Sequence, residues 1–477
     1  MKHLIKFILI YIFIANNLSA QTNSNAEMKI DSLFSNYNSK TAGVAVGIVK
    51  DGELIFKKGY GTANLEYDIP ITPKTIFNVG SVSKQFTTFS IYLLEKQGKI
   101  SLDDDIRKYI PELPIYEKTI TIKHLCSHTS GLKDQWALLT LAGWRMDDVI
   151  TTEQVMKIVT KQKELNFSPG SQFKYSNTGF TLLTEIVKRV SGKSFSAFAK
   201  ENIFDPLGME NTLVYDDNEK IVKNRAYSYG SENGLYSKRN LNSSSVGPSN
   251  VYTTVEDLSK WTANFENPKV GDAAFINHFN ERSLLDNGEP AILAVSDGET
   301  IYHAKGQFIR NYKSLTVYNH TGSDAGFKSY LGRFQDNKLS IILLSNDESF
   351  VSYKAGMDIA AFYLSDKFKK RAPVTEPEKK AEEKPKYIPA THLKDFEGQF
   401  QNTELSSLFT LKVDNGKLIM THSRLSDVVL TEAEKDTFTG TITFSVEVSF
   451  QRNKKNEITG LSITNFGAAN VKFIKLK

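Results

Sequence analysis

A serine and a lysine stand three residues apart in the segment NVGSVSKQF, at Ser81 and Lys84. Residues with this spacing lie on one face of an α-helix, one turn apart. The residues that follow, 83–97, are predicted to form an amphipathic helix, and backbone N–H groups at its start would stabilise negative charge on a reacting oxygen. If Lys84 is buried, its ammonium form is disfavoured and it can accept the serine proton. The pair can therefore act as nucleophile and base.

The S-x-x-K spacing is a weak signal by itself. It recurs from Ser130 to Lys133 and from Ser171 to Lys174, and a serine at a helix start also serves as an ordinary cap. What distinguishes Ser81 is its place at the start of an otherwise apolar helix. Further groups are needed to decide between a cap and a nucleophile.

Tyr175 and Asn177 supply a second set of groups at the start of another predicted helix, residues 177–189. A tyrosine hydroxyl can relay a proton to a leaving group. An asparagine amide both donates and accepts hydrogen bonds, so it can orient a substrate amide. These two residues therefore fit a proton relay and a substrate-positioning group.

A third set, His320-Thr321-Gly322, ends one predicted strand ahead of another. Glycine there would let a substrate backbone lie close against the strand edge, so all three residues are predicted to bind substrate. The N–H of Ser323 would join the N–H of Ser81 in an oxyanion hole.

S-x-x-K, Y-x-N and a basic residue followed by Thr-Gly, in this order, resemble the three motifs of the serine β-lactamase and penicillin-binding protein family. Y-x-N in place of S-D-N resembles the class C β-lactamase and D-Ala-D-Ala carboxypeptidase branch. HLCSHTSGL, SPGSQFKYSNTGFTLL, DPLGMENT and VYTTVEDLSKW are also similar to that branch, so the resemblance covers most of residues 30–365. It implies a β-lactamase/transpeptidase-like fold.

The resemblance also implies a role for each motif residue. Ser81 would be the nucleophile, Lys84 the general base and Tyr175 the proton relay. Asn177 and His320 would position the substrate. Most β-lactamases of this branch have lysine where this chain has His320, whereas histidine is found among D-amino-acid peptidases of the family. This departure favours a peptidase or esterase over an efficient β-lactam-hydrolysing enzyme.

The function predicted is that of an exported serine hydrolase that forms an acyl-enzyme on Ser81 and needs no cofactor or metal. Its substrates would be D-Ala-type peptides, β-lactams or small esters and amides, and peptidoglycan is a candidate partner. The alternative is a peptidoglycan- or penicillin-binding protein without significant turnover. The intact motifs favour turnover.

Composition divides the chain in two. Residues 371–390, RAPVTEPEKKAEEKPKYIPA, are rich in Pro, Glu and Lys and are predicted to be a linker. Residues 24–370 mix helical and strand patterns and are predicted to form an α+β domain, an antiparallel sheet flanked by helices plus a helical region. Residues 391–477 carry short alternating strands and are predicted to form a small all-β sandwich or barrel, lipocalin-like in type.

Residues 1–20 have the pattern of a secretory signal peptide. Two lysines precede an apolar run, residues 7–15, and small residues precede Gln21, so cleavage after Ala20 is predicted. An uncleaved anchor is the alternative. No cysteine follows the cleavage site to carry a lipid anchor, and no later run is long enough to span a bilayer. A periplasmic or secreted protein without a stable membrane anchor is expected.

Charge and cysteine content exclude other classes. The formal net charge of +5 includes Lys2 and Lys6 of the leader and has no long basic block behind it, so nucleic-acid binding is not expected. The single cysteine, Cys126, cannot form an intramolecular disulfide. His124 and His128 have the spacing of a metal pair but lack the glutamate of H-E-x-x-H, so structural roles are favoured.

Overall fold

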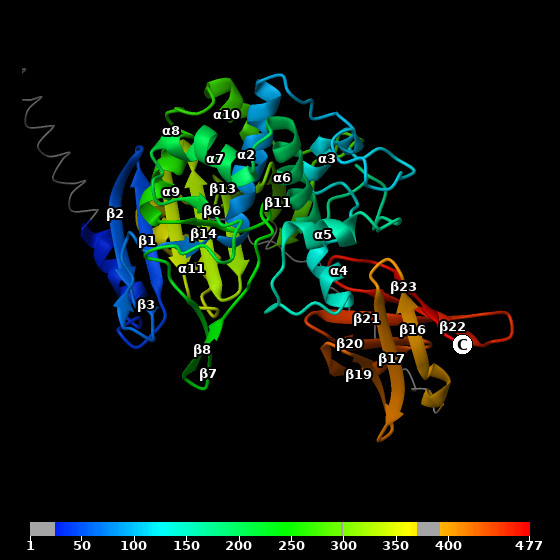
Figure 1. The fold of residues 1–477 in the computed structure, drawn as a ribbon. Coiled ribbons are helices and arrows are strands. Elements are labelled where there is room, and N and C mark those ends of the chain that lie inside the picture. The colour runs from blue at the N-terminus through cyan, green and yellow to red at the C-terminus, as the bar shows by residue number, and fades with distance from the viewer. Residues whose placement is uncertain (1–23, 297–298, 370–391) are drawn as a thin grey trace, which may run out of the picture.

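The computed structural model describes residues 24–296, 299–369 and 392–477. The predicted signal peptide, residues 1–20, and the predicted linker, residues 371–390, lie outside the described residues. Residues 24–369 form a body of sheet and helices, and residues 392–477 form a β-barrel beside it (Figure 1). The predicted α+β fold followed by a small all-β unit is confirmed.

An eight-stranded antiparallel sheet organises the body. The strand order is β10-β11-β12-β13-β14-β15-β1-β2, so the two ends of the body meet where β15 pairs with β1. The strands are β1 (Val44–Lys50), β2 (Glu53–Tyr60), β10 (Ile292–Ser296), β11 (Glu299–Ala304), β12 (Gln307–Tyr312), β13 (Leu315–Asp324), β14 (Phe327–Phe334) and β15 (Leu339–Ser345). Asp51 and Gly52 both have positive φ, 51° and 81°, as the predicted tight hairpin turn between β1 and β2 requires.

Both faces of this sheet are covered, because side chains alternate along each strand. Val46 and Ile48 of β1 are buried in one core with α11 (Ser352–Leu364). Val49 is buried in the core of the opposite face, together with side chains of α9 (Val255–Ala263). A helix at residues 24–33 also covers the α11 face.

The remaining helices fill the α9 side of the sheet. They are α2 (Ser83–Lys96), α3 (Ile122–Cys126), α4 (Gln135–Leu141), α5 (Thr152–Val159), α6 (Asn177–Ser191), α7 (Phe195–Ala199), α8 (Asp205–Leu207) and α10 (Ala273–Asn280). The amphipathic helix expected at residues 83–97 is present as α2, but residues 83–94 are all buried and exposure begins only after residue 94. It has no solvent face there because it lies in the middle of the body, against α6 and the sheet (Figure 1).

Short strands link these layers. They are β3 (Thr62–Asn64), β4 (Ile69–Pro70), β5 (Phe77–Asn78), β6 (Leu213–Val214), β7 (Ser228–Glu232), β8 (Leu235–Arg239) and β9 (Val251–Thr253). The β5-β9-β6 sheet leads directly into the turn that carries Ser81, and the β7–β8 hairpin projects from the body (Figure 1).

The small all-β unit is a closed barrel of eight antiparallel strands in sequence order, with β23 pairing back onto β16. The strands are β16 (Gly398–Asn402), β17 (Ser407–Asp414), β18 (Lys417–His422), β19 (Leu425–Glu434), β20 (Thr437–Thr441), β21 (Ser445–Arg452), β22 (Ile458–Thr464) and β23 (Val471–Lys475). Of the two predicted forms, the barrel is correct. Its interior is packed with aromatic side chains, among them Phe400, Phe409, Phe438 and Phe473.

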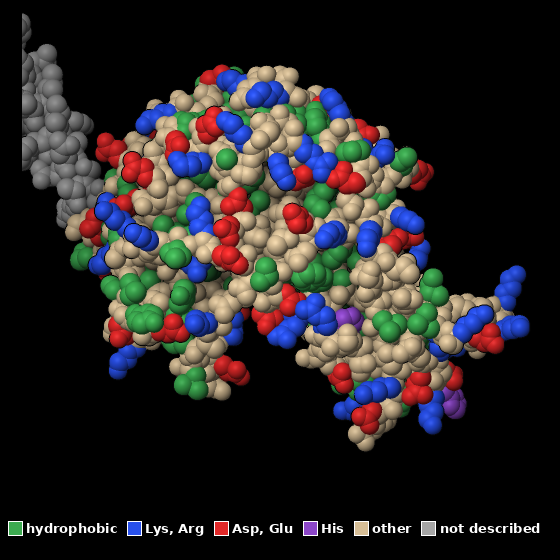
Figure 2. Space-filling model, in the orientation of Figure 1, with side chains coloured by type: hydrophobic (Ala, Val, Ile, Leu, Met, Phe, Trp, Pro, Cys, Tyr) green, Lys and Arg blue, Asp and Glu red, His purple; other side chains and the backbone are tan. Residues whose placement is uncertain are grey.

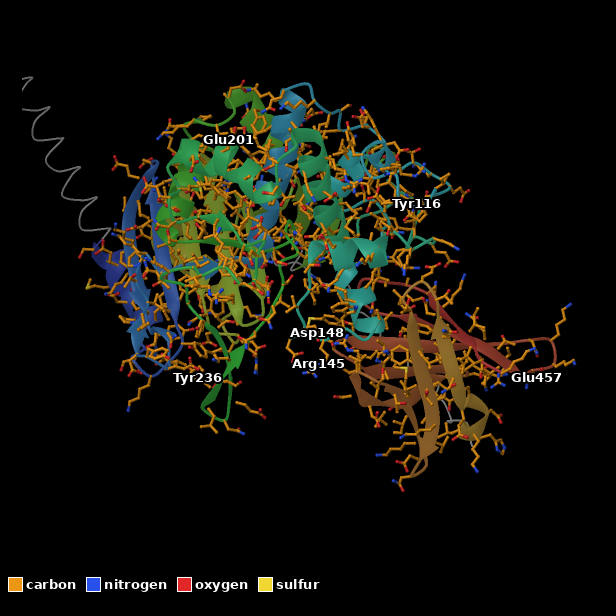
Figure 3. All side chains as sticks on the ribbon, viewed as in Figure 1. Tyr116, Arg145, Asp148, Glu201, Tyr236 and Glu457 are labelled. Carbon is orange, nitrogen blue, oxygen red and sulfur yellow. The ribbon has the colours of Figure 1, made fainter. Side chains whose placement is uncertain are left out.

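The barrel is docked against the α4 side of the body. The Ser407 hydroxyl donates to the Leu141 carbonyl at 2.7 Å, and the Asp134 N–H donates to the Gly467 carbonyl at 2.9 Å. Arg424 of the barrel forms an ion pair at 2.8 Å with Asp148, which Figure 3 labels on the body next to the barrel. These contacts fix the barrel loops relative to α4.

Candidate active site

Ser81 lies on a 3₁₀ turn, η1 (Gly80–Val82), that runs straight into α2. Strand β13 crosses directly against this turn. The Ser329 hydroxyl of β14 donates to the Val79 carbonyl at 2.7 Å, which ties the turn to the sheet. The sheet and α2 together therefore fix the position of Ser81.

The Lys84 ammonium group is completely buried and has three partners. Its Nζ is 3.2 Å from the Ser81 Oγ, 2.9 Å from the Asn177 Oδ1 and 2.8 Å from the Pro248 carbonyl oxygen. The two carbonyl oxygens can only accept hydrogen bonds, so they take two N–H donors of the lysine. When Lys84 is neutral, its lone pair is left in the third direction, toward the Ser81 hydroxyl.

Burial favours that neutral form. Desolvation lowers the pKa of Lys84 from 10.5 to about 7, against the opposing charges of Asp134 and Asp324. A base with a pKa near the working pH is suited to taking a proton from a hydroxyl group. The sequence predicted that Lys84 acts as a base if it is buried, and the structure shows that it is buried.

Asn177 is itself held by Asp134. One carboxylate oxygen of Asp134 accepts the Asn177 backbone N–H at 2.6 Å and its side-chain Nδ2 at 2.9 Å. This arrangement fixes the amide so that Oδ1 faces Lys84. Asp134 is fully buried, and desolvation raises the pKa of its carboxyl group.

Tyr175 lies in the loop before α6 and lines the same cavity as Ser81. Its ring stacks on the His128 ring with centroids 4.4 Å apart, and Lys84 Nζ lies 4.8 Å from its centroid. Desolvation raises the pKa of Tyr175 well above its usual value. The phenol therefore keeps its proton and can donate it to a leaving group.

The backbone amides of Ser81 and Ser323 lie on adjacent segments. A Cβ added to Gly80, whose φ is +51°, would come within 2.7 Å of the Ser323 nitrogen. β12 pairs with β13 only as far as Asn319, so the β13 edge from residue 320 onward is not covered by β12. This is where the predicted oxyanion hole would form.

Replacing Gly322 by alanine is expected to slow acylation by about 10²-fold, the scale of losing one oxyanion donor. The new Cβ would lie 2.0 Å from the Val79 carbonyl oxygen, so β13 must move away from the Ser81 turn. Burst kinetics with a chromogenic ester measure the effect, and thermal unfolding checks the fold. In Gly179→Ala, the control on α6, the new Cβ meets its nearest atom at 3.4 Å. Equal acylation rates in both variants would contradict the expectation.

His320 is buried close to the catalytic groups, with its ring centroid 6.3 Å from that of Tyr175. It is 3% exposed, its ring packs on Phe308 with centroids 4.8 Å apart, and its Nδ1 is 2.5 Å from the Thr321 carbonyl oxygen. Burial, together with the nearby Lys84 charge, lowers the pKa of His320 to about 3. The imidazole is therefore neutral at working pH, and it cannot attract a substrate carboxylate as a lysine would.

A cavity of about 510 Å³ opens beside Ser81. Of the predicted site residues, Ser81, Tyr175, Asn177 and Ser323 line it, whereas Lys84, His320, Thr321 and Gly322 do not. Figure 2 shows the surface hollowed between the β7–β8 hairpin and the barrel, where the cavity lies. Three lining residues, Thr443, Phe444 and Phe466, come from the barrel.

Several residues of the site escaped sequence reasoning. His128 was singled out only for a metal spacing, yet its Nδ1 accepts the Ser176 N–H at 3.1 Å and its ring supports Tyr175. His124 instead completes a capping box with Thr121, a structural role as expected. Asp134 and the barrel aromatics carried no motif signal.

Comparison with protein families settles the relationship of the chain. The family model for beta-lactamase matches residues 30–364, which is more than half of the chain. The chain belongs to the beta-lactamase family. The predicted family and the predicted enzyme class, a serine hydrolase, are thereby confirmed.

Two curated members of the beta-lactamase family illustrate its range. Penicillin-binding protein 4* of Bacillus subtilis (strain 168) is 27% identical over 348 residues, covering 71% of this chain and 74% of that protein. The D-aminopeptidase of Gluconobacter oxydans (strain 621H) is 25% identical over 319 residues, covering 67% of this chain but only 58% of that protein.

Solved structures of low sequence identity share the fold. The octameric penicillin-binding protein homologue from Pyrococcus abyssi, 21% identical, gives a TM-score of 0.61 over 96% of this chain and 100% of that chain. The D-amino acid amidase from Ochrobactrum anthropi SV3, also 21% identical, gives a TM-score of 0.60 over 73% of this chain and 99% of that chain. Within the described parts of the beta-lactamase-family chain, no helix combines the length and apolar character needed to cross a bilayer.

Proposed function

We propose that this protein is an exported hydrolase that forms an acyl-enzyme on Ser81 and acts on amides or esters of D-amino acids. One observation carries the proposal: Lys84 is buried with two obligate acceptors, so its neutral lone pair faces the Ser81 hydroxyl. Export is proposed from the leader pattern of residues 1–20.

In acylation, neutral Lys84 takes the Ser81 proton as Oγ attacks the substrate carbonyl carbon. The N–H groups of Ser81 and Ser323 stabilise the oxyanion, while Asn177 orients the substrate amide. The bond from the carbonyl carbon to the leaving nitrogen or oxygen breaks, and the Tyr175 hydroxyl donates a proton to the leaving group. Lys84 then returns its proton to Tyr175. In deacylation, water attacks the carbonyl carbon of the ester on Ser81, and the bond from that carbon to Oγ breaks. The proton transfers run in reverse: the water proton passes through Tyr175 to Lys84, and Lys84 protonates Oγ.

The third motif directs the choice of substrate. β-Lactams and peptides ending in D-Ala carry a carboxylate, and a lysine at position 320 would meet it with a fixed charge. His320 is neutral, and the Arg239 side chain that lines the cavity is already paired with Glu348 at 2.7 Å. Thr321 and Gly322 would position the substrate backbone along the β13 edge. Neutral or amine-bearing substrates, as the names of the D-aminopeptidase and D-amino acid amidase relatives suggest, fit this site better.

A panel assay on the mature protein tests the proposal. Alanine amides and p-nitrophenyl esters of D and L configuration, a chromogenic β-lactam and a D-Ala-D-Ala peptide are compared by kcat/KM. We expect the D-amide or D-ester to have the highest value. Stoichiometric adduct formation without turnover on every substrate would support the alternative, a penicillin- or peptidoglycan-binding protein. No adduct and no turnover with any substrate would overturn both.

A further inference from the structure

The barrel reaches into the cavity that contains Ser81. Thr443 and Phe444 lie in the loop between β20 and β21, and Phe466 lies in the loop between β22 and β23. All three line the same cavity as Ser81 and Tyr175. Residues more than 350 positions away in the sequence thus face the nucleophile.

Phe444 and Phe466 form an aromatic pair whose apolar surface is incompletely covered by protein. Their ring centroids are 4.5 Å apart with planes at 62°, an edge-to-face contact. Phe466 is 50% exposed, although the ring is large and apolar. Trp136, Met146 and Leu241 also line the cavity, so an apolar group placed there would contact protein on several sides.

The loop that carries Phe466 is clamped to the active site. The carbonyl of its neighbour Gly467 accepts the N–H of Asp134 at 2.9 Å and the Nδ2 of Asn166 at 2.9 Å. The Asn166 Oδ1 in turn accepts the Ala469 N–H at 2.8 Å. Because Asp134 also holds Asn177, the barrel loop and the catalytic groups share one fixed residue.

The fit at Gly467 is close. A Cβ added there would lie 2.4 Å from the Asp134 Cβ, so the loop backbone packs directly on the residue that holds Asn177. The position of the Phe466 ring relative to Ser81 is therefore set by backbone contacts and does not depend on side-chain packing alone. A pre-positioned apolar wall discriminates between substrates by how much apolar surface they bury.

We propose that the barrel is a specificity element of the enzyme, in which Phe444 and Phe466 bind an aromatic or large aliphatic group of the substrate. The inference rests on the proposed acyl-enzyme function of Ser81 and goes beyond it by naming the substrate class. Arg239 and Glu348, which also line the cavity, are charged and paired with each other, so an apolar group of the substrate would be bound by the apolar lining residues.

The test uses Phe444→Ala and Phe466→Ala in the full chain, with two pairs of chromogenic substrates. One pair differs by phenyl against methyl on the acyl side of the scissile bond, and the other differs in the same way on the leaving-group side. For one pair we expect the ratio of kcat/KM, phenyl over methyl, to fall about tenfold or more in each variant. The methyl substrate is expected to keep nearly its wild-type kcat/KM.

Two further variants separate substrate contact from a structural effect. Phe466→Tyr keeps the ring and should retain the wild-type ratio. Ile474→Ala removes another exposed apolar side chain of the barrel, on β23 and outside the cavity lining, and should also retain it. A ratio unchanged in both alanine variants, or an equal loss on both members of each pair, overturns the inference alone. A wild-type protein that is acylated by none of the substrates overturns the proposed function and the inference with it.

Discussion

Replacing Ser81 by alanine is expected to lower turnover by a factor on the order of a thousand or more, because the acyl-enzyme cannot form without the nucleophilic oxygen. Ser81 is only partly buried, and among the described residues the hydrogen bond of its hydroxyl is the one to Lys84. The variant should therefore unfold at nearly the wild-type temperature. Steady-state hydrolysis and a thermal melt measure the two quantities.

Mass spectrometry gives the direct form of the same experiment. Incubation with an acylating ester should add one acyl mass to the wild-type chain, on the peptide that contains Ser81, and none to Ser81→Ala. Ser171→Ala is the matched control, because Ser171 begins another S-x-x-K but its exposed hydroxyl donates to the Ser168 carbonyl. An adduct that stays in Ser81→Ala and disappears in the control would show that the mechanism is wrong.

The second large effect concerns Lys84 and pH. The general base must be neutral, and the pKa of Lys84 is lowered to about 7, so kcat/KM should be low in acid, rise through about pH 7 and level off above it. Lys84→Met removes the base while keeping a side chain of similar length. Its turnover is expected to fall by about 10²- to 10⁴-fold and to lose this pH dependence.

Asp134→Asn tests whether the rise of kcat/KM with pH is due to the titration of Lys84. The Asp134 charge raises the pKa of Lys84, so its removal should lower that pKa and move the rise of kcat/KM to lower pH. Asp147→Asn is the control, since Asp147 is exposed and paired with Arg145. If the pH at which kcat/KM rises shifts equally in both variants, or in neither, the group that titrates is not Lys84.

The sequence by itself determined the features that depend on short separations. Ser81 and Lys84 face the same way because the spacing of three is fixed by helix geometry. The Asp51-Gly52 hairpin and the barrel strands follow from turn residues and alternation, which need only neighbouring positions. The order of the three motifs was enough to identify the family, and the family implied the fold of the body.

The tertiary structure alone decided the chemical state of these groups. Whether Lys84 is a base depends on desolvation and on Pro248 and Asn177, which lie 164 and 93 positions further along the chain. His320 was predicted to position the substrate, and only its burial shows that its imidazole is neutral. A pKa is set by the whole surrounding volume, which no local pattern encodes.

The composition of the cavity wall was also beyond the sequence. All three motifs precede residue 324, so a division at the linker placed the site wholly in the large domain. Phe444 and Phe466 lie in barrel loops with no motif and no periodicity, and they reach Ser81 only because the barrel docks on Asp134. Docking depends on the complementarity of the barrel surface and the body surface, and these surfaces exist only after each part has folded.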